Sequence, residues 1–287
     1  MHILVNGVRL FVDVEGAGLV AEGSVMREKP TMILLHGGPG ADHSIFKPAF
    51  SQLSDLAQII YVDHRGNGRS EDGDPKHWTL DQWADDLFAL CQTLGIKEPI
   101  IFGASFGGFV AQAYATKYPG HLRALILAAT TAHVDFETIF AAFGRIAGPL
   151  AGQVARAYWS GPTPERRQAY FENCLPHYSV APPDSDMMQR MTVKNPVAMH
   201  FNGPNNEMGR FDFRAALNRL TCPILILSGD RDPMMPVPFS DVLLTSLGNA
   251  RATHHTLPDA GHLLEYDQPE VFFAHLRRFI SEDIACD

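Results

Sequence analysis

Cysteine is scarce in this chain of 287 residues, which contains only Cys91, Cys174, Cys222 and Cys286. They lie far apart in the sequence, and no two of them form a C-x-x-C pair. Domains that depend on disulfides carry cysteine densely and in paired spacings. We therefore expect reduced thiols, a cytoplasmic protein, and a fold stabilised by its hydrophobic core.

Runs of basic residues and long apolar runs are also missing. Lys and Arg number 23 against 32 Asp and Glu, which gives a formal net charge of −9. Nucleic-acid partners need clustered positive charge, so none is expected. No segment approaches the roughly 18 apolar residues of a membrane-spanning helix, so no membrane partner is expected. The first twelve residues alternate in polarity around Asn6-Gly7, which predicts a β-hairpin and not a signal peptide.

Metal-binding patterns are missing as well, although the chain contains 13 histidines. It has no H-E-x-x-H motif and no cluster of cysteine and histidine at ligand spacing. We expect neither a metal nor another cofactor. Hydrophobic residues make up 46% of the chain and charged residues 19%, a composition that can bury a large core.

What the chain does contain is a G-x-S-x-G motif, Gly103-Ala104-Ser105-Phe106-Gly107. The apolar run 100–102 before it predicts a buried strand, and residues 108–115 after it predict a helix. A strand, this tight turn and a helix together form a nucleophile elbow. Bulk beside the serine would strike the neighbouring strand or helix, which explains the flanking glycines. We therefore predict that Ser105 is a nucleophile exposed at the carboxyl edge of a sheet.

A serine hydroxyl is a weak nucleophile near neutral pH and needs a base and an orienting acid. In elbow-containing enzymes these partners follow in the order Ser, Asp or Glu, His. The apolar run 223–228 predicts a strand, and Asp232 on the loop after it is our choice for the acid. Asp230 is the second choice, with a role in the turn as the simpler interpretation. His262 lies on the loop after the last predicted strand and is the expected base.

The negative charge that develops on a substrate carbonyl oxygen needs hydrogen-bond donors, which together form an oxyanion hole. One is expected to be the backbone amide of Phe106, directly after the nucleophile. The other should come from the glycine-rich loop after the predicted strand 31–35, where Gly38 is the better candidate. His36 in the same loop is interpreted as a buried residue that braces it.

The pattern of elements divides the chain into three parts. Residues 1–132 alternate short apolar strands with helices, which predicts a mostly parallel central sheet with helices on both faces. Residues 133–216 lose the strand pattern and become helical, with many aromatic residues and methionines. We interpret this segment as an inserted helical cap over the elbow. Residues 217–287 return to the core.

Three motifs carry a resemblance to a known family: His36-Gly37-Gly38-Pro39-Gly40, the segment 63–70 (DHRGNGRS) and the segment 202–207 (NGPNNE). With them the chain resembles the α/β-hydrolase superfamily over nearly its full length. More narrowly, it is similar to the proline iminopeptidase group, serine aminopeptidases that release an N-terminal residue, typically proline. The resemblance implies the α/β-hydrolase fold. It also implies that Glu207 binds the substrate's free α-amine, although Asn206 is an extra residue before it.

These observations predict a serine hydrolase that cleaves an amide or ester bond of a small molecule or short peptide through an acyl-enzyme. The resemblance favours a proline iminopeptidase-type aminopeptidase. The alternative is a carboxylesterase or lactonase acting on a neutral acyl substrate. A non-catalytic ligand receptor on the same fold is a third possibility, which would not need the nucleophile, acid, base and oxyanion loop together.

Overall fold

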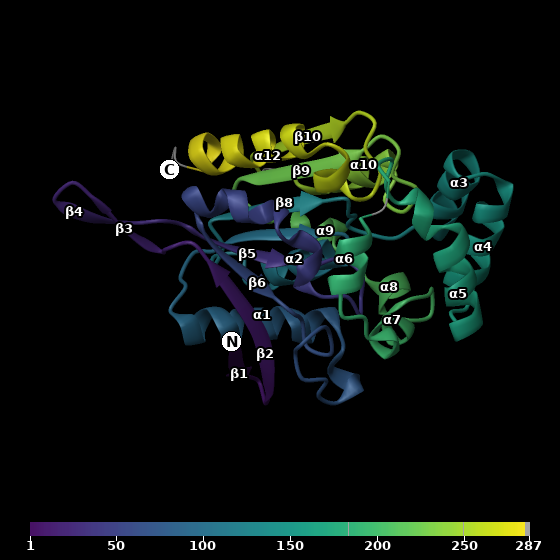
Figure 1. Cartoon of the computed structure of the whole chain (residues 1–287), viewed down its shortest axis with the longest axis horizontal. Coiled ribbons are helices and arrows are strands. Elements are labelled where there is room, and N and C mark those ends of the chain that lie inside the picture. The colour runs from purple at the N-terminus through teal and green to yellow at the C-terminus, as the bar shows by residue number, and fades with distance from the viewer. Residues whose placement is uncertain (183, 249, 285–287) are drawn as a thin grey trace.

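The computed structural model describes residues 1–182, 184–248 and 250–284 (Figure 1). In this part of the chain the main sheet has eight strands in the order β1-β2-β6-β5-β7-β8-β9-β10. The six strands β6-β5-β7-β8-β9-β10 are parallel to one another, whereas β2 pairs antiparallel with both β6 and the edge strand β1. The predicted mostly parallel sheet is confirmed. The main strands are β1 (His2–Val5), β2 (Val8–Glu15), β5 (Thr31–Leu35), β6 (Gln58–Val62), β7 (Ile100–Ala104), β8 (Ala124–Ala128), β9 (Ile224–Gly229) and β10 (Ala252–Leu257).

The N-terminal region of the chain contains two β-hairpins. Asn6 and Gly7 connect β1 to β2 with positive φ angles of 45° and 78°, as expected for an Asn-Gly turn. The predicted N-terminal hairpin is therefore confirmed. A second hairpin, β3 (Leu19–Glu22) with β4 (Val25–Glu28), forms an arm that extends away from the sheet (Figure 1).

The central strands are apolar on both faces because helices cover both. Ile33 and Leu35 of β5 belong to one hydrophobic cluster, and Met32 and Leu34 belong to the other. On the first face lie α1 (Leu80–Leu94), α2 (Phe106–Lys117) and α10 (Val237–Ser246). On the second face lie α12 (Pro269–Arg278) and the 3-10 turns η1 (His43–Phe46) and η2 (Ala49–Asp55). A parallel sheet packed in this way directs the carboxyl ends of its strands toward one common edge.

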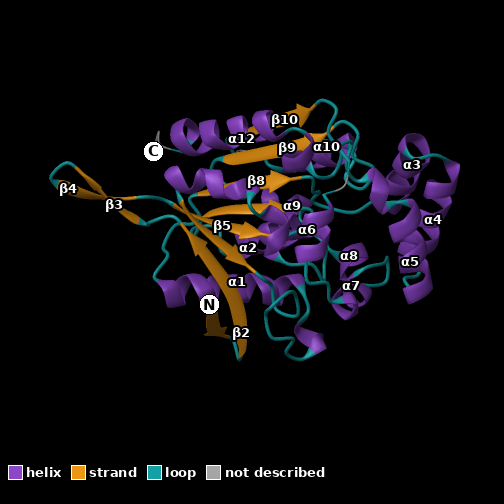
Figure 2. Cartoon of the chain, in the orientation of Figure 1, coloured by secondary structure: helices purple, strands orange, loops and turns teal. Residues whose placement is uncertain are grey.

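Helices replace strands between β8 and β9. Figure 2 shows α3, α4 and α5 beyond the ends toward which the β8 and β9 arrows point. The helices of this region are α3 (Phe136–Ile146), α4 (Pro149–Ser160), α5 (Pro164–Asn173), α6 (Ser185–Arg190), α7 (Asn195–Phe201), α8 (Glu207–Arg210) and α9 (Arg214–Leu217). The remaining elements are α11 (Leu264–Asp267), the turns η3 (Pro75–His77) and η4 (Leu175–His177), and the π-helical turn η5 (Phe279–Asp283).

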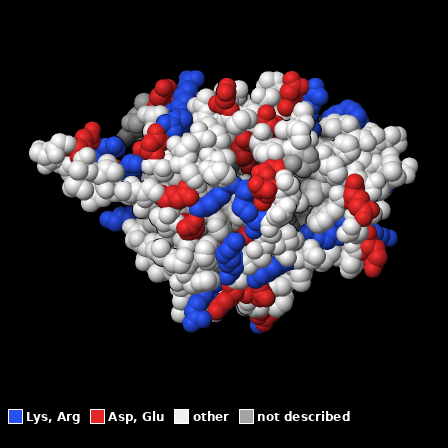
Figure 3. Space-filling view, in the orientation of Figure 1, with Lys and Arg blue, Asp and Glu red and all other residues white. Residues whose placement is uncertain are grey.

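Three of the four cysteines lie in the part of the chain that the structure describes. Cys91 and Cys174 are buried and Cys222 is partly buried, all as free thiols, while Cys286 lies outside the described residues. Among the described residues, none of the helices has the length and apolarity to cross a membrane. Figure 3 shows positive and negative side chains interspersed over the face in view, without a continuous basic surface.

Candidate active site

Ser105 occupies a strained turn between β7 and α2. Its φ is 53° and its ψ is −119°, a conformation that residues other than glycine rarely adopt. The flanking glycines make this turn possible. A Cβ on Gly103 would lie 2.4 Å from the carbonyl oxygen of Gly107, and a Cβ on Gly107 would lie 1.9 Å from that of Leu35. Gly103 is therefore required by the tightness of the turn onto α2, and Gly107 by the packing of the turn against β5.

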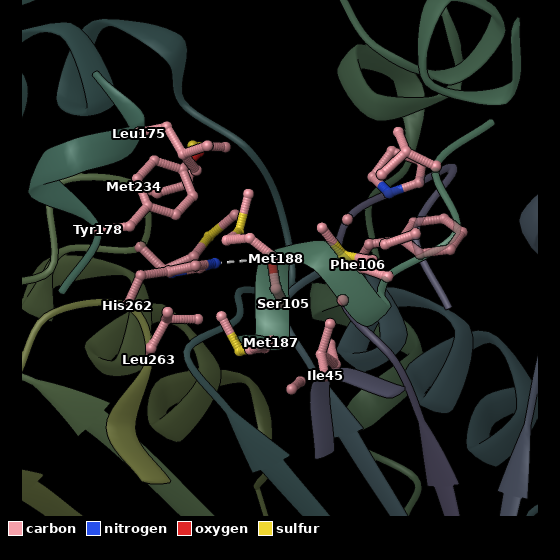
Figure 4. A pocket seen from close by; sticks show the side chains of 18 of the residues that line it. Ile45, Ser105, Phe106, Leu175, Tyr178, Met187, Met188, Met234, His262 and Leu263 are labelled. Atoms are coloured by element: carbon pink, nitrogen blue, oxygen red, sulfur yellow. Dashed lines mark hydrogen bonds between the residues drawn. The ribbon is translucent and has the colours of Figure 1, made fainter. Parts of the chain in front are cut away.

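The structure brings Ser105, His262 and Asp232 into one hydrogen-bonded row. Figure 4 shows His262 beside Ser105 in this row. The Oγ of Ser105 lies 2.9 Å from Nε2 of His262, and Nδ1 of His262 lies 2.8 Å from Oδ2 of Asp232. The other oxygen of Asp232 accepts hydrogen bonds from the amides of Met234 and Met235, at 2.7 and 2.8 Å. An imidazole held between a carboxylate and a hydroxyl in this way can accept the hydroxyl proton.

Asp230, the second choice for the acid, lies elsewhere. Its side chain is exposed, and its carboxylate accepts a hydrogen bond from the amide of Ala260 at 3.3 Å. This contact joins the loop after β9 to the loop that carries His262. The position of Asp230 fits its interpretation as a turn residue, whereas Asp232 is 1% exposed and directly contacts the histidine.

The glycine-rich loop after β5 lies against the elbow. A Cβ on Gly37 would be 3.2 Å from the Cβ of Ser105, and Gly38 has a positive φ of 56°. Gly38 and Phe106 both line the cavity above the serine. Phe106 is the first residue of α2, where a backbone amide has no acceptor within the helix. Both residues therefore lie beside the nucleophile, and the amide at the start of α2 is available as a donor.

Buried polar residues hold that loop in place. Nε2 of His36 accepts a hydrogen bond from the amide of His64, so Nδ1 donates to the carbonyl oxygen of Gly37 at 2.9 Å. Burial lowers the pKa of His36, which keeps the ring neutral in this bracing position. Asn67 of the segment 63–70 accepts a hydrogen bond from the amide of Gly40 at 2.6 Å. This second motif therefore supports the loop.

A cavity of about 470 Å³ opens above Ser105. Its lining is dominated by apolar side chains from both the core and the helical region (Figure 4). Aromatic side chains from α4 and α5 contribute, including Trp159, Tyr170 and Phe171. Methionines are prominent: Met187, Met188, Met191, Met208, Met234 and Met235. Unbranched methionine side chains adapt to ligands of different shape, so this lining suits a bulky apolar group.

Glu207 is not brought to this cavity. It begins α8, and its carboxylate accepts a hydrogen bond from the amide of Leu80 at 2.7 Å. That amide is one of the unpaired donors at the N-terminus of α1, where a carboxylate is electrostatically favoured. Burial raises the pKa of Glu207, against the opposing effect of the Leu80 amide. The neighbouring Met208 lines the cavity in its place.

The family model described as the alpha/beta hydrolase fold matches residues 30–269. The chain belongs to the α/β-hydrolase family. The expected resemblance is confirmed further by curated proline iminopeptidases. Proline iminopeptidase PfmaB of Pestalotiopsis fici is 40% identical over 123 residues, which cover 42% of this chain and 43% of that protein. The proline iminopeptidase of Clostridium botulinum is 27% identical over 229 residues, covering 75% and 78% of the two chains.

Several of the curated relatives are matched over less than half of their length, as PfmaB is. Solved structures are matched over nearly whole chains. A thermophilic esterase from Thermogutta terrifontis has a TM-score of 0.70 at 25% identity, covering 98% of both chains. The proline iminopeptidase of Mycobacterium smegmatis has a TM-score of 0.74 at 22% identity, covering 100% and 99%, and shows the common fold.

Sequence reasoning missed a contact between the helical region and the histidine of this α/β hydrolase. The amide of His262 donates a hydrogen bond to the carbonyl oxygen of Tyr178 at 2.6 Å, and the two rings pack edge to face. Asp267 reinforces the contact, because its carboxylate accepts hydrogen bonds from the amides of Val180, Ala181 and Gly261. No local pattern links residues so far apart in the sequence.

In the ranges that the structure describes, no three His, Cys, Asp or Glu side chains are arranged to hold a metal ion. The chemistry available to this α/β hydrolase at its cavity is that of a serine hydroxyl beside an imidazole, with backbone amides as additional donors.

Proposed function

We propose that this α/β hydrolase is a serine hydrolase that cleaves an amide or ester bond through an acyl-enzyme on Ser105. The observation that carries the proposal is the hydrogen-bonded row Asp232–His262–Ser105. The serine of this row lines an apolar cavity. A ligand receptor on the same fold would need a cavity but no aligned proton acceptor on a strained serine.

The reaction begins when His262 takes the proton of Ser105 and the oxygen attacks the substrate carbonyl. Asp232 holds the imidazole in the required tautomer and stabilises its positive charge. The amides of Gly38 and Phe106 donate hydrogen bonds to the developing oxyanion. His262 then gives the proton to the leaving amine or alcohol. Water, activated by the same imidazole, releases the acyl group and restores the serine.

The cavity favours substrates with a bulky apolar group on the acyl side. A small acetyl group would leave much of the volume of about 470 Å³ unfilled. Each methylene that leaves water and contacts the methionine and aromatic lining contributes about 0.8 kcal/mol. We therefore expect kcat/KM to rise with the size of the apolar group until the cavity is filled.

The leading reaction is that of an aminopeptidase of the proline iminopeptidase type, supported by the relatives of that name. Hydrolysis of a neutral ester or lactone is the second candidate, which the apolar lining favours. The two differ in whether the substrate carries an ammonium group. The carboxylate of Glu207 accepts a hydrogen bond at the start of α1, and Glu207 is not among the residues that line the cavity.

A panel of chromogenic substrates tests the proposal. Aminoacyl p-nitroanilides of proline, leucine and phenylalanine would be compared with p-nitrophenyl esters from acetate to octanoate. The wild-type protein should hydrolyse members of the panel, with larger apolar groups preferred. Ser105→Ala should reduce kcat by several orders of magnitude while the circular dichroism spectrum stays unchanged. Undiminished hydrolysis by the folded Ser105→Ala variant would overturn the proposal.

A further inference from the structure

The helix α11 begins at Leu264, just after His262, and contacts the segment 180–182 of the helical region. Its neighbours fix it on both sides. Tyr266 donates a hydrogen bond to the carbonyl oxygen of Pro182 at 2.8 Å, and Asp267 accepts hydrogen bonds from the amides of Val180 and Ala181. Glu265 is the second residue of this short helix, and it lines the cavity that contains Ser105. The carboxyl group is therefore carried on an anchored helix and lines the same cavity as Ser105 and His262.

Glu265 differs from the other charged residues of the lining, because those residues have partners. Lys47 forms ion pairs with Asp13 and Glu15. Arg167 donates hydrogen bonds to the Asn195 side chain and the Tyr158 hydroxyl, each at 3.0 Å. Asp184 accepts hydrogen bonds from the amides of Asp186 and Met187 at the start of α6.

Across the described ranges of the chain, the side chain of Glu265 makes no hydrogen bond or ion pair with another residue. Burial raises its pKa to about 7, while its own backbone amide and the His262 ring act in the opposite direction. A partly buried carboxylate without a partner is costly, and folded proteins generally pair such groups. Its position in the cavity makes a ligand the available partner.

We propose that Glu265 is the residue that selects the charge of the substrate, by binding an ammonium group on the acyl part of a bulky apolar substrate. The proposal rests on the proposed serine hydrolase and assigns to α11 the amine contact that Glu207 was expected to make. An ammonium group beside Glu265 would displace water and form an ion pair with the carboxylate. An anionic group at the same place would be repelled. The substrates favoured are therefore aminoacyl compounds with an apolar side chain.

The test compares substrates that differ only in the amine. Leucine p-nitroanilide and 4-methylpentanoyl p-nitroanilide share the same carbon skeleton, and their ratio of kcat/KM measures the value of the ammonium group. At pH 7.5 a substantial fraction of both the carboxylate and the α-amine is charged. Glu265→Gln should lower this ratio by about 30-fold or more, as expected for removing one partner of a buried charge pair.

Glu270 provides a matched control, because it is exposed on α12 and Glu270→Gln removes the same charge outside the cavity. This variant should leave the ratio unchanged. Melting temperatures of both variants show whether either change disturbs the fold. An equal ratio in the wild-type protein and in folded Glu265→Gln would overturn the proposal.

Binding without turnover separates this inference from the proposed function. The Ser105→Ala variant, titrated by calorimetry, should bind leucinamide more tightly than 4-methylpentanamide. Adding Glu265→Gln to that variant should abolish the difference. If the difference is present but the wild-type protein hydrolyses no substrate, the serine-hydrolase proposal fails and the ammonium site stands. If Ser105→Ala binds the two amides equally, the ammonium site fails whatever the catalytic result.

Discussion

Replacing Glu265 by glutamine should make the protein more stable at alkaline pH. Burial raises the pKa of this carboxyl from 4.5 to about 7. Between these two values the folded protein holds a proton that the unfolded chain has released. Stability therefore falls as the pH rises from 4.5 to 7 and stays at the lower level above it. The whole shift corresponds to about 3 kcal/mol.

Because the side chain retains some contact with water, we expect about 1–2 kcal/mol of this effect to be measurable. Glutamine has nearly the same shape and no charge, so it avoids the penalty at every pH. Urea unfolding at pH 5 and pH 8 would give the free energy of unfolding of Glu265→Gln, Glu270→Gln and the wild-type protein. The gain of Glu265→Gln over wild type should be larger at pH 8 than at pH 5.

The control Glu270→Gln should show no such pH-dependent gain, because that side chain is exposed. A loss of stability in Glu265→Gln that is equal at both pH values would refute the reasoning. It would mean that the carboxylate has a structural partner in the folded protein. A gain combined with a weaker preference for ammonium substrates would instead identify a residue retained for binding at a cost in stability.

Two further predictions concern the carboxylates around His262. Asp232→Asn should keep the fold and lower kcat by about 10⁴-fold, because the imidazole loses its orienting partner; Asp230→Asn, measured in parallel, should change kcat little. Asp267→Asn should lower the melting temperature by about 3–10 °C, because the amides of Val180, Ala181 and Gly261 lose a charged acceptor. Calorimetry would check it, and an unchanged melting temperature would show that the contact between Gly261 and the segment 179–181 does not depend on this carboxylate.

Much of the fold followed from local patterns. The central strands are continuous apolar runs because both faces of the sheet are covered, and the turn Asn6-Gly7 produced the expected hairpin. The position of Ser105 at the end of β7 also followed from its flanking glycines. Chain order pointed to Asp232 and His262, because the loops after parallel strands meet at one edge of the sheet. The structure places both side chains in contact, as that geometry requires.

The helical region could not be derived in the same way. Its side chains are positioned by contacts between residues far apart in the sequence, such as Glu207 with Leu80 and His262 with Tyr178. Glu207, which follows the extra residue Asn206, contacts the amide of Leu80, and its neighbour Met208 lines the cavity. Glu265 escaped notice because a single acidic residue on a short helix has no distinctive pattern. Its significance comes from the cavity beside it and from the partners that it lacks within the described residues.

Covalent labelling of Ser105 tests the central claim most directly. The wild-type protein would be incubated with a fluorophosphonate probe, digested, and analysed by mass spectrometry to locate the modified residue. The account predicts one modification per chain, on Ser105, and its loss in Ser105→Ala. Labelling of His262→Ala should be strongly slowed, because the hydroxyl loses its proton acceptor. Modification of another residue, or labelling that persists in Ser105→Ala, would contradict the account.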